Sequence, residues 1–110
     1  MNSREIRQLY ETNADKEAIL ASYGALLAEK EPLGGINASG ESGELKLGEE
    51  LAFMAANFTH PEALEYLFNL GVDPQVKDPY AFTLLHEAAK RNYYHYRPAP
   101  GDAAKTAELL

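Results

Sequence analysis

The fold is decided by residues 83–89, which read TLLHEAA. A threonine directly before an apolar run at helical spacing predicts a helix start, because its hydroxyl can accept a hydrogen bond from a first-turn amide. His86 lies three residues after Thr83, where a capping-box partner would reach back towards the start of the helix. Ala88 and Ala89 are small enough to let a neighbouring helix approach closely. The segment therefore predicts a capped, closely packed helix.

A similar segment occurs earlier in the chain. Residues 51–57 read LAFMAAN and align with residues 85–92, LHEAAKRN, so that Leu85 follows Leu51 by 34 positions. Residues 35–38 and 73–76 form a second pair at a spacing of 38, and the additional residues fit in the glycine-rich loop 39–50, where insertion costs little. A period near 33 with two helices and a turn indicates a repeat protein whose units stack.

These segments resemble the ankyrin repeat family. Residues 70–78, LGVDPQVKD, are similar to the family's inter-repeat segment, and residues 83–89 are similar to its T-P-L-H-x-A-A signature. Residues 62–68 and 105–110 are similar to its second helix. The resemblance implies an all-α, ankyrin-like helical repeat in one domain over residues 1–110. Its units would cover about residues 3–38, 39–76 and 77–110, the last truncated, with short turns or hairpin-like loops between them.

The sequence departs from the family pattern at several positions. Leu84 stands where the family has proline, and Ala52 stands where a second histidine would lie. Ala81 stands where the turn usually has glycine, so a positive φ at this position would be strained. Residues 92–102 form a polar, aromatic insertion between the last two helices. We therefore expect irregular loops.

Helix signals elsewhere predict further short helices and no convincing strand. Ser3 is a candidate cap for a helix over residues 4–10, and Asn13 is one for a helix that ends before Gly34. Pro61 suits the first turn of a helix that Gly71 closes. A third helix is expected from about Leu51, and a last one from about Ala103 to Leu110.

Composition narrows the function classes. The chain has 110 residues, 45% hydrophobic and 25% charged, with a formal net charge of −7 and no cysteine. Disulfides, thiolate metal sites and cysteine nucleophiles are excluded. The acidity argues against nucleic acid and favours a partner with a basic surface. With no secretory leader or apolar span recognised, a cytoplasmic protein without membrane contact is expected.

No motif for catalysis, cofactor binding or metal binding stands out. His86-Glu87 is followed by Lys90, so the zinc motif H-E-x-x-H is absent, and no phosphate-binding loop or G-x-S-x-G motif occurs. His60 and His86 are interpreted as residues of helix starts or turns. The expectation is a non-enzymatic protein that binds another protein, with no catalytic residues, cofactor or metal.

The expected contacts follow from the resemblance, which implies that loop tips and exposed first-helix faces touch the partner. Two groups of residues result. The loop and its adjoining helix contribute Lys77, Pro79, Tyr80, Glu87, Lys90 and Arg91. The insertion contributes Tyr94, Tyr96 and Arg97, because tyrosine and arginine commonly anchor interfaces, although one or two of these rings could instead cover the core.

Alternatives remain open at this point. By analogy alone, a small acidic chain could be an inhibitor or immunity-like protein. A small ligand-binding protein or enzyme with its site at Tyr93–Arg97 is the alternative from another class, with Arg97 holding an anion and His95 moving a proton. The chain ends at Leu110 without a polar cap, so self-association through an open C-terminal end is a third possibility.

Overall fold

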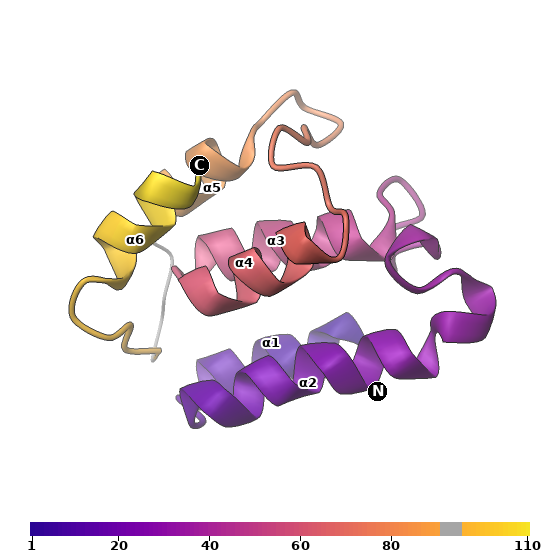
Figure 1. Ribbon diagram of the computed structural model, residues 1–110, viewed down its shortest axis with the longest axis horizontal. Coiled ribbons are helices and arrows are strands. Elements are labelled where there is room, and N and C mark those ends of the chain that lie inside the picture. The colour runs from indigo at the N-terminus through magenta and orange to yellow at the C-terminus, as the bar shows by residue number, and fades with distance from the viewer. Residues whose placement is uncertain (91–95) are drawn as a thin grey trace.

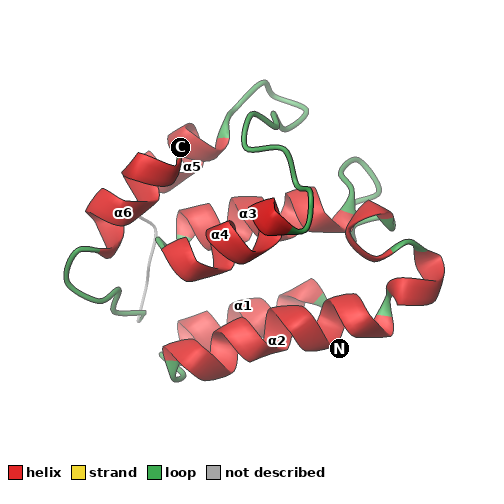
Figure 2. Cartoon of the chain, in the orientation of Figure 1, coloured by secondary structure: helices red, strands yellow, loops and turns green. Residues whose placement is uncertain are grey.

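The computed structural model describes residues 1–90 and 96–110 of the chain. These residues form α-helices, two short 3₁₀ helices and two isolated β-bridges, with no strand (Figures 1 and 2). The all-α expectation is thereby confirmed for this part of the chain. The elements are α1 (Ser3–Glu11), α2 (Lys16–Glu29), η1 (Glu31–Leu33), η2 (Gly35–Asn37), α3 (Leu47–Asn57), α4 (Pro61–Asn69), α5 (Leu84–Lys90) and α6 (Asp102–Leu109).

The helices form three paired tiers (Figure 1). Helices α1 and α2 lie in the first tier, α3 and α4 in the second, and α5 and α6 in the third. Helix α3 packs against both α4 and α5, and α4 packs against α6. The middle tier is therefore covered on both sides, which explains why most of the residues in α3 are buried.

Three predicted helix starts are corrected. The cap of α1 is Asn2, whose side chain accepts a hydrogen bond from the Glu5 amide at 3.0 Å, whereas Ser3 lies inside the helix. Asn13 does not cap α2; it has a φ of 53° after the end of α1, and α2 begins at Lys16. Helix α3 begins at Leu47, four residues before the predicted Leu51.

Other boundaries follow the sequence signals closely. Pro61 is the first residue of α4, and Gly71, with a φ of 112°, follows its end. Thr83 and His86 form the expected reciprocal cap of α5. The His86 amide donates to Thr83 Oγ1 at 3.2 Å, and the Thr83 amide donates to His86 Nδ1 at 3.0 Å.

Aromatic rings and alanines fill the core. The rings of Tyr10 and Phe58 stack with centroids 4.3 Å apart, and Tyr96 meets Tyr10 edge to face at 5.0 Å. Alanines of α3 and α4 let the helices approach closely; the fully buried ones are Ala52, Ala55, Ala56 and Ala63. The core thus joins residues from the first tier, the middle tier and the segment before α6.

Each of two long loops is closed by one antiparallel bridge. Ser39 pairs with Lys46 before α3, and Lys77 pairs with Thr83 before α5. Both loops therefore leave and re-enter the helical body at neighbouring points. None of the helices among residues 1–90 and 96–110 has the length and apolar character needed to cross a bilayer.

Candidate functional site: the 77–83 loop and a partly buried polar network

The loop before α5, residues 77–83, is held by hydrogen bonds to Asp78. The Asp78 carboxylate oxygen Oδ1 accepts from the backbone amides of Tyr80 and Phe82, both at 2.9 Å. The Asp78 amide donates to the Phe82 carbonyl, and its carbonyl accepts from the Ala81 amide, again both at 2.9 Å. Ala81 has a φ of 65°, so the turn is left-handed at the position where the ankyrin pattern usually has glycine. One carboxylate therefore fixes the path of the loop.

This loop presents aromatic and basic side chains to solvent. The Tyr80 side chain is the most exposed of the large apolar residues in the described chain, at 80%, and Phe82 is 41% exposed. The Lys90 ammonium lies 5.1 Å from the centre of the Phe82 ring and 3.1 Å from Glu87 Oε2. Exposed Lys77 starts the loop. A fixed loop with protruding rings has the character of a protein contact surface.

The other predicted contact residues do not all join this loop. Arg97 is exposed, but its amide donates to Asn13 Oδ1 at 3.0 Å, next to the turn between α1 and α2. Tyr96 is 2% exposed and packs on Tyr10 and Phe58, so its ring belongs to the core and is withdrawn as a contact residue. Arg91 and Tyr94 lie outside the described residues, as do Tyr93 and His95.

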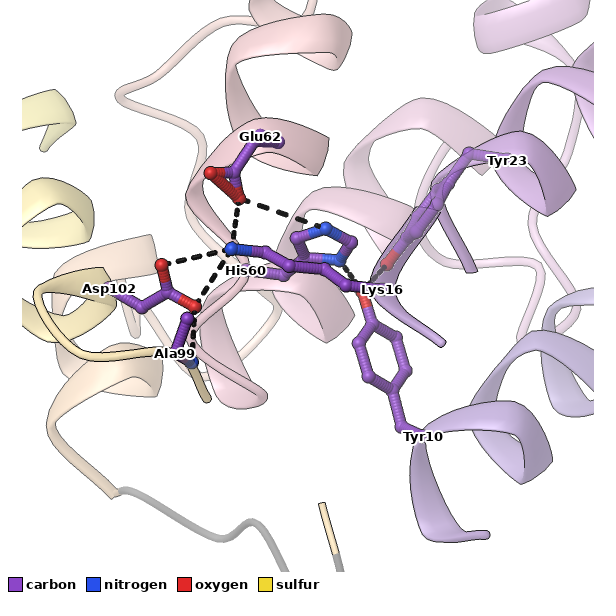
Figure 3. A network of polar contacts seen from close by, with 7 residues as sticks. All are labelled: Tyr10, Lys16, Tyr23, His60, Glu62, Ala99 and Asp102. Carbon is purple, nitrogen blue, oxygen red and sulfur yellow. Dashed lines mark hydrogen bonds and ion pairs between the residues drawn. The ribbon is translucent and has the colours of Figure 1, made fainter. Parts of the chain in front are cut away.

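A partly buried polar network connects the three tiers (Figure 3). Lys16, at the start of α2, places its ammonium 2.9 Å from both carboxylate oxygens of Asp102 and 2.6 Å from Glu62 Oε1. Asp102 is the first residue of α6, and its carboxylate also accepts a hydrogen bond from the Ala99 amide at 2.8 Å. Burial alone would lower the pKa of Lys16, but the bonds to the two carboxylates raise it. The ammonium therefore stays charged at neutral pH.

The network continues through His60, which lies between α3 and α4. Its Nδ1 is 2.7 Å from the Tyr10 hydroxyl, and that hydroxyl is 2.7 Å from the hydroxyl of Tyr23. Burial, assisted by the charge of Lys16, lowers the pKa of His60 to about 4. Burial raises the pKa of both tyrosines. All three rings are therefore neutral at physiological pH.

These pKa directions bear on what the network can do. Lys16, His60 and Glu62 line a surface hollow of about 210 Å³. A general acid or base works best when its pKa is near the working pH, whereas these groups keep one protonation state around neutrality. Among residues 1–90 and 96–110, no group of three or more histidine, cysteine or acidic side chains is arranged to hold a metal. We interpret the network as a set of structural contacts that hold the three tiers together.

Little in the sequence predicts this network. His60 was expected to be a cap or turn residue, and it does precede α4, but its side chain makes no cap hydrogen bond. Tyr10 and Tyr23 belong to the predicted apolar faces of their helices, and both are buried. The hydrogen bond between their hydroxyls cannot be predicted from that spacing. Glu62 lies two residues after His60 in the sequence. Lys16, which contacts the Glu62 carboxylate, is far from both in the sequence, so the pattern does not connect them.

Comparison with known proteins finds no matching family model, no matching curated protein and no matching solved structure. The resemblance to ankyrin repeats therefore stays a prediction.

Proposed function

We propose that this chain is a protein-interaction module that binds a partner protein through the 77–83 loop. The observation that carries the proposal is Tyr80, which is 80% exposed on a loop whose backbone is fixed by Asp78. A loop whose backbone is already fixed loses little conformational freedom on binding, so more of the contact free energy of its side chains becomes affinity. Tyrosine is also enriched among the residues that dominate interfaces.

Lys77, Lys90 and the Phe82 ring would complete the contact surface around Tyr80. Phe82 and Lys90 are already in contact with each other, so the rim of this surface is partly organised before binding. The net charge of −7 would speed the encounter with a partner that has a basic surface, because opposite charges attract at long range; the two lysines of the contact surface itself do not contribute to this attraction. Inhibition of that partner, as an immunity-like protein would do, is one form of this function; nucleic acid is not proposed.

We further propose that the tiers are ankyrin-like units. Supporting this, the bridge at Ser39 and Lys46 has a counterpart at Lys77 and Thr83, at corresponding points before α3 and α5. The pairing of α3 with α5 and of α4 with α6 agrees with stacked units. An experimental structure in which residues 35–69 and 73–109 fail to superimpose would contradict this assignment.

Self-association and a site at Tyr93–Arg97 are two further proposals, each with one observation that bears on it. Self-association through the α5–α6 end is suggested by Leu85, which is 53% exposed there; a strict monomer in light scattering at high concentration would exclude it. A ligand-binding or catalytic site at Tyr93–Arg97 falls mostly outside the described residues, and Tyr96 is buried in the core.

Capture from native lysate tests the proposed contact surface. The wild-type chain, Tyr80→Ala and Leu33→Ala are immobilised in parallel and washed at near-physiological salt. Leu33 is a matched control, because it is 69% exposed on η1, away from the loop. We expect a specific protein to be retained by the wild type and Leu33→Ala and lost with Tyr80→Ala. Equal capture by all three chains would contradict the assignment to this loop, and no specific capture at all would contradict the function.

A further inference from the structure

Two surface hollows lie along the line where α2 of the first tier packs against α4 of the second (Figure 1). The first turns of these helices meet where Lys16 contacts Glu62, at the hollow of about 210 Å³ described above. Their last turns border a larger hollow of about 340 Å³, which Leu27 and Leu70 line. The two helices therefore run in the same direction, with one hollow near each end.

Helical spacing places the lining residues of both hollows on one face of each helix. On α4 they are Glu62, Tyr66 and Leu70, each four residues after the last. On α2 they run from Glu17, in steps of three or four, to Glu31 just beyond the helix, a span of about 21 Å. Residues at this spacing line up along a helix, so both hollows belong to one groove. The α2 side consists of Glu17, Leu20, Gly24, Leu27, Ala28 and Glu31.

The middle of this groove is apolar and open. Leu27 is 6% exposed and lies at its floor, whereas Leu70 is 46% exposed at its edge. Gly24 and Ala28 add little or no side chain between them, so no bulky group of α2 fills the groove at these positions. Exposed apolar surface rimmed by polar residues is typical of an interaction site.

Carboxylates mark both ends of the groove. Glu17 and Glu31 are exposed, and the ion pairs formed among residues 1–90 and 96–110 involve neither of them. Lys16 also lines the first hollow, but its ammonium is already held by Glu62 and Asp102. A complementary partner therefore carries positive charge at both ends of an apolar strip.

The backbone of the partner must be helical to fit such a groove. Side chains of α2 and α4 form the groove, and neither helix offers a row of free backbone groups as a strand edge does. An extended peptide would bury its own amides and carbonyls there without partners, whereas a helix satisfies them internally. A second copy of the chain docked through the same face would bring its own Glu17 and Glu31 against these carboxylates, so like charges would meet.

We propose that the α2–α4 groove binds a basic, amphipathic α-helix of a partner protein. Apolar side chains on one face of that helix lie between Leu27 and Leu70, and its lysine or arginine side chains lie near Glu17 and Glu31. This is the helix-in-groove mode of recognition. The proposal does not depend on partner binding by the 77–83 loop, because no residue of that loop lines the groove.

Titration of the isotope-labelled chain with a synthetic helical peptide, monitored by backbone amide NMR signals, tests the proposal. The probe is an alanine-based peptide of about 18 residues, because shorter helices are marginal in water. Its leucines are spaced by three and four on one face, and its lysines are confined to the first and last turns. We expect saturable shifts along α2 and α4, and weaker binding as the salt concentration rises. No saturable shift, or shifts centred on another face, would overturn the proposal.

Three altered peptides test the stated chemistry of the partner. One has glutamate in place of every lysine, one has the leucines redistributed around the helix, and one has a central proline that breaks the helix. We expect each to bind roughly tenfold or more weakly than the probe. Equal binding of the glutamate peptide would overturn the charge assignment, and equal binding of the proline peptide would overturn the helical one.

Two pairs of variants locate the probe on the chain. Ala28→Arg places a long, positively charged side chain in the groove and should abolish binding, whereas Ala25→Arg makes the same change at an exposed alanine outside the lining. Glu31→Gln should weaken binding roughly two- to fivefold, as for one exposed ion pair. Glu44→Gln changes the net charge equally at an exposed loop residue and is its control.

Circular dichroism checks that each variant keeps its helices, which is expected because all four positions are exposed. Unchanged affinity in Ala28→Arg, or an equal loss in Ala25→Arg, would overturn the assignment of the helix to this groove. Tyr80→Ala should bind the probe like the wild type, so failure of this proposal is distinguishable from failure of the 77–83 loop as a contact surface.

Discussion

The ammonium of Lys16 lies 2.9 Å from both carboxylate oxygens of Asp102, although 86 positions separate the two residues in the sequence. The same ammonium contacts Glu62, so one cation neutralises a carboxylate from the second tier and another from the third. The side chains of Lys16 and Glu62 are partly exposed, at 27% and 37%, whereas that of Asp102 is 7% exposed. Removing the cation would leave the nearly buried Asp102 carboxylate without its counter-charge.

Lys16→Met should therefore destabilise the fold. Breaking a fully buried pair costs about 3–5 kcal/mol and an exposed pair less than about 1 kcal/mol. We expect a loss between these limits, about 1–3 kcal/mol, measured by urea unfolding. Lys105→Met, at an exposed lysine of α6, should change the free energy of unfolding by less than about 0.5 kcal/mol. Similar losses in both variants would contradict a special role of Lys16.

Stability should fall as the pH is lowered below about 6.5, the ordinary pKa of histidine. The pKa of His60 is about 4 in the folded protein because of burial. Between these values the unfolded chain binds a proton that the folded chain does not. Each pH unit can then remove up to about 1.4 kcal/mol from the free energy of unfolding. His60→Gln should flatten this slope in urea titrations at several pH values.

Glu62 adds a second loss of stability, at lower pH, to the dependence of the free energy of unfolding on pH. Burial would raise the pKa of Glu62, but its bond with Lys16 wins and lowers it. The stability from this pair is present above the unfolded pKa and is lost as the pH falls through the folded value. A slope between pH 6.5 and 4 that is identical in wild type and His60→Gln would contradict the assignment of that region to His60.

Ala81→Gly should stabilise the protein. Ala81 has a φ of 65° and is exposed, so its side chain gains little from packing. The left-handed conformation costs about 1–2 kcal/mol for a residue with Cβ, while glycine loses about 0.5–1 kcal/mol more on folding. We expect a net gain of about 0.5–1 kcal/mol in thermal or urea unfolding. Ala21→Gly, at an exposed position within α2, should instead lose about 1 kcal/mol.

Two glycines within helices should respond oppositely to alanine. A Cβ added to Gly48 would lie 2.8 Å from both Ile36 Cβ and Val72 Cγ2, closer than packed atoms allow. Gly48→Ala should therefore cost about 1–3 kcal/mol through overpacking. A Cβ added to Gly24 would meet only the Tyr66 hydroxyl, at 3.4 Å, so Gly24→Ala should gain up to about 1 kcal/mol from helix propensity. A gain in stability in both variants would contradict the overpacking argument, because it would show that Ile36 and Val72 move away from an added Cβ at little cost.

The sequence predicts those parts of the structure that neighbouring residues decide. Thr83 and His86 form the predicted cap because the bonds join residues three apart. Ala81 has a positive φ at the position where the ankyrin pattern has glycine, because the path of the turn is set by nearby residues. Leu47 was missed as the start of α3 because the capping interaction involves Lys46 and Glu49, whose polar pattern resembles a loop.

The burial of Tyr96 and the polar network depend on contacts between residues that are far apart in the sequence. Tyr96 belongs to a segment rich in tyrosine and arginine, which by composition favours an interface, yet its ring is buried because it meets Tyr10 from the first helix. The bond between His60 and Tyr10 likewise joins residues 50 positions apart. No periodic pattern specifies such encounters, because periodicity describes one element at a time.

The contact between Tyr96 and Tyr10 has a consequence for how this molecule comes apart. In an open stack each unit touches only its neighbours, so the outermost unit can fray while the others persist. A ring from the segment before the last helix is here wedged against a ring from the first helix, with centroids 5.0 Å apart. Loosening either terminus therefore opens the same aromatic cluster, and melting is expected to be all-or-none instead of starting from one end.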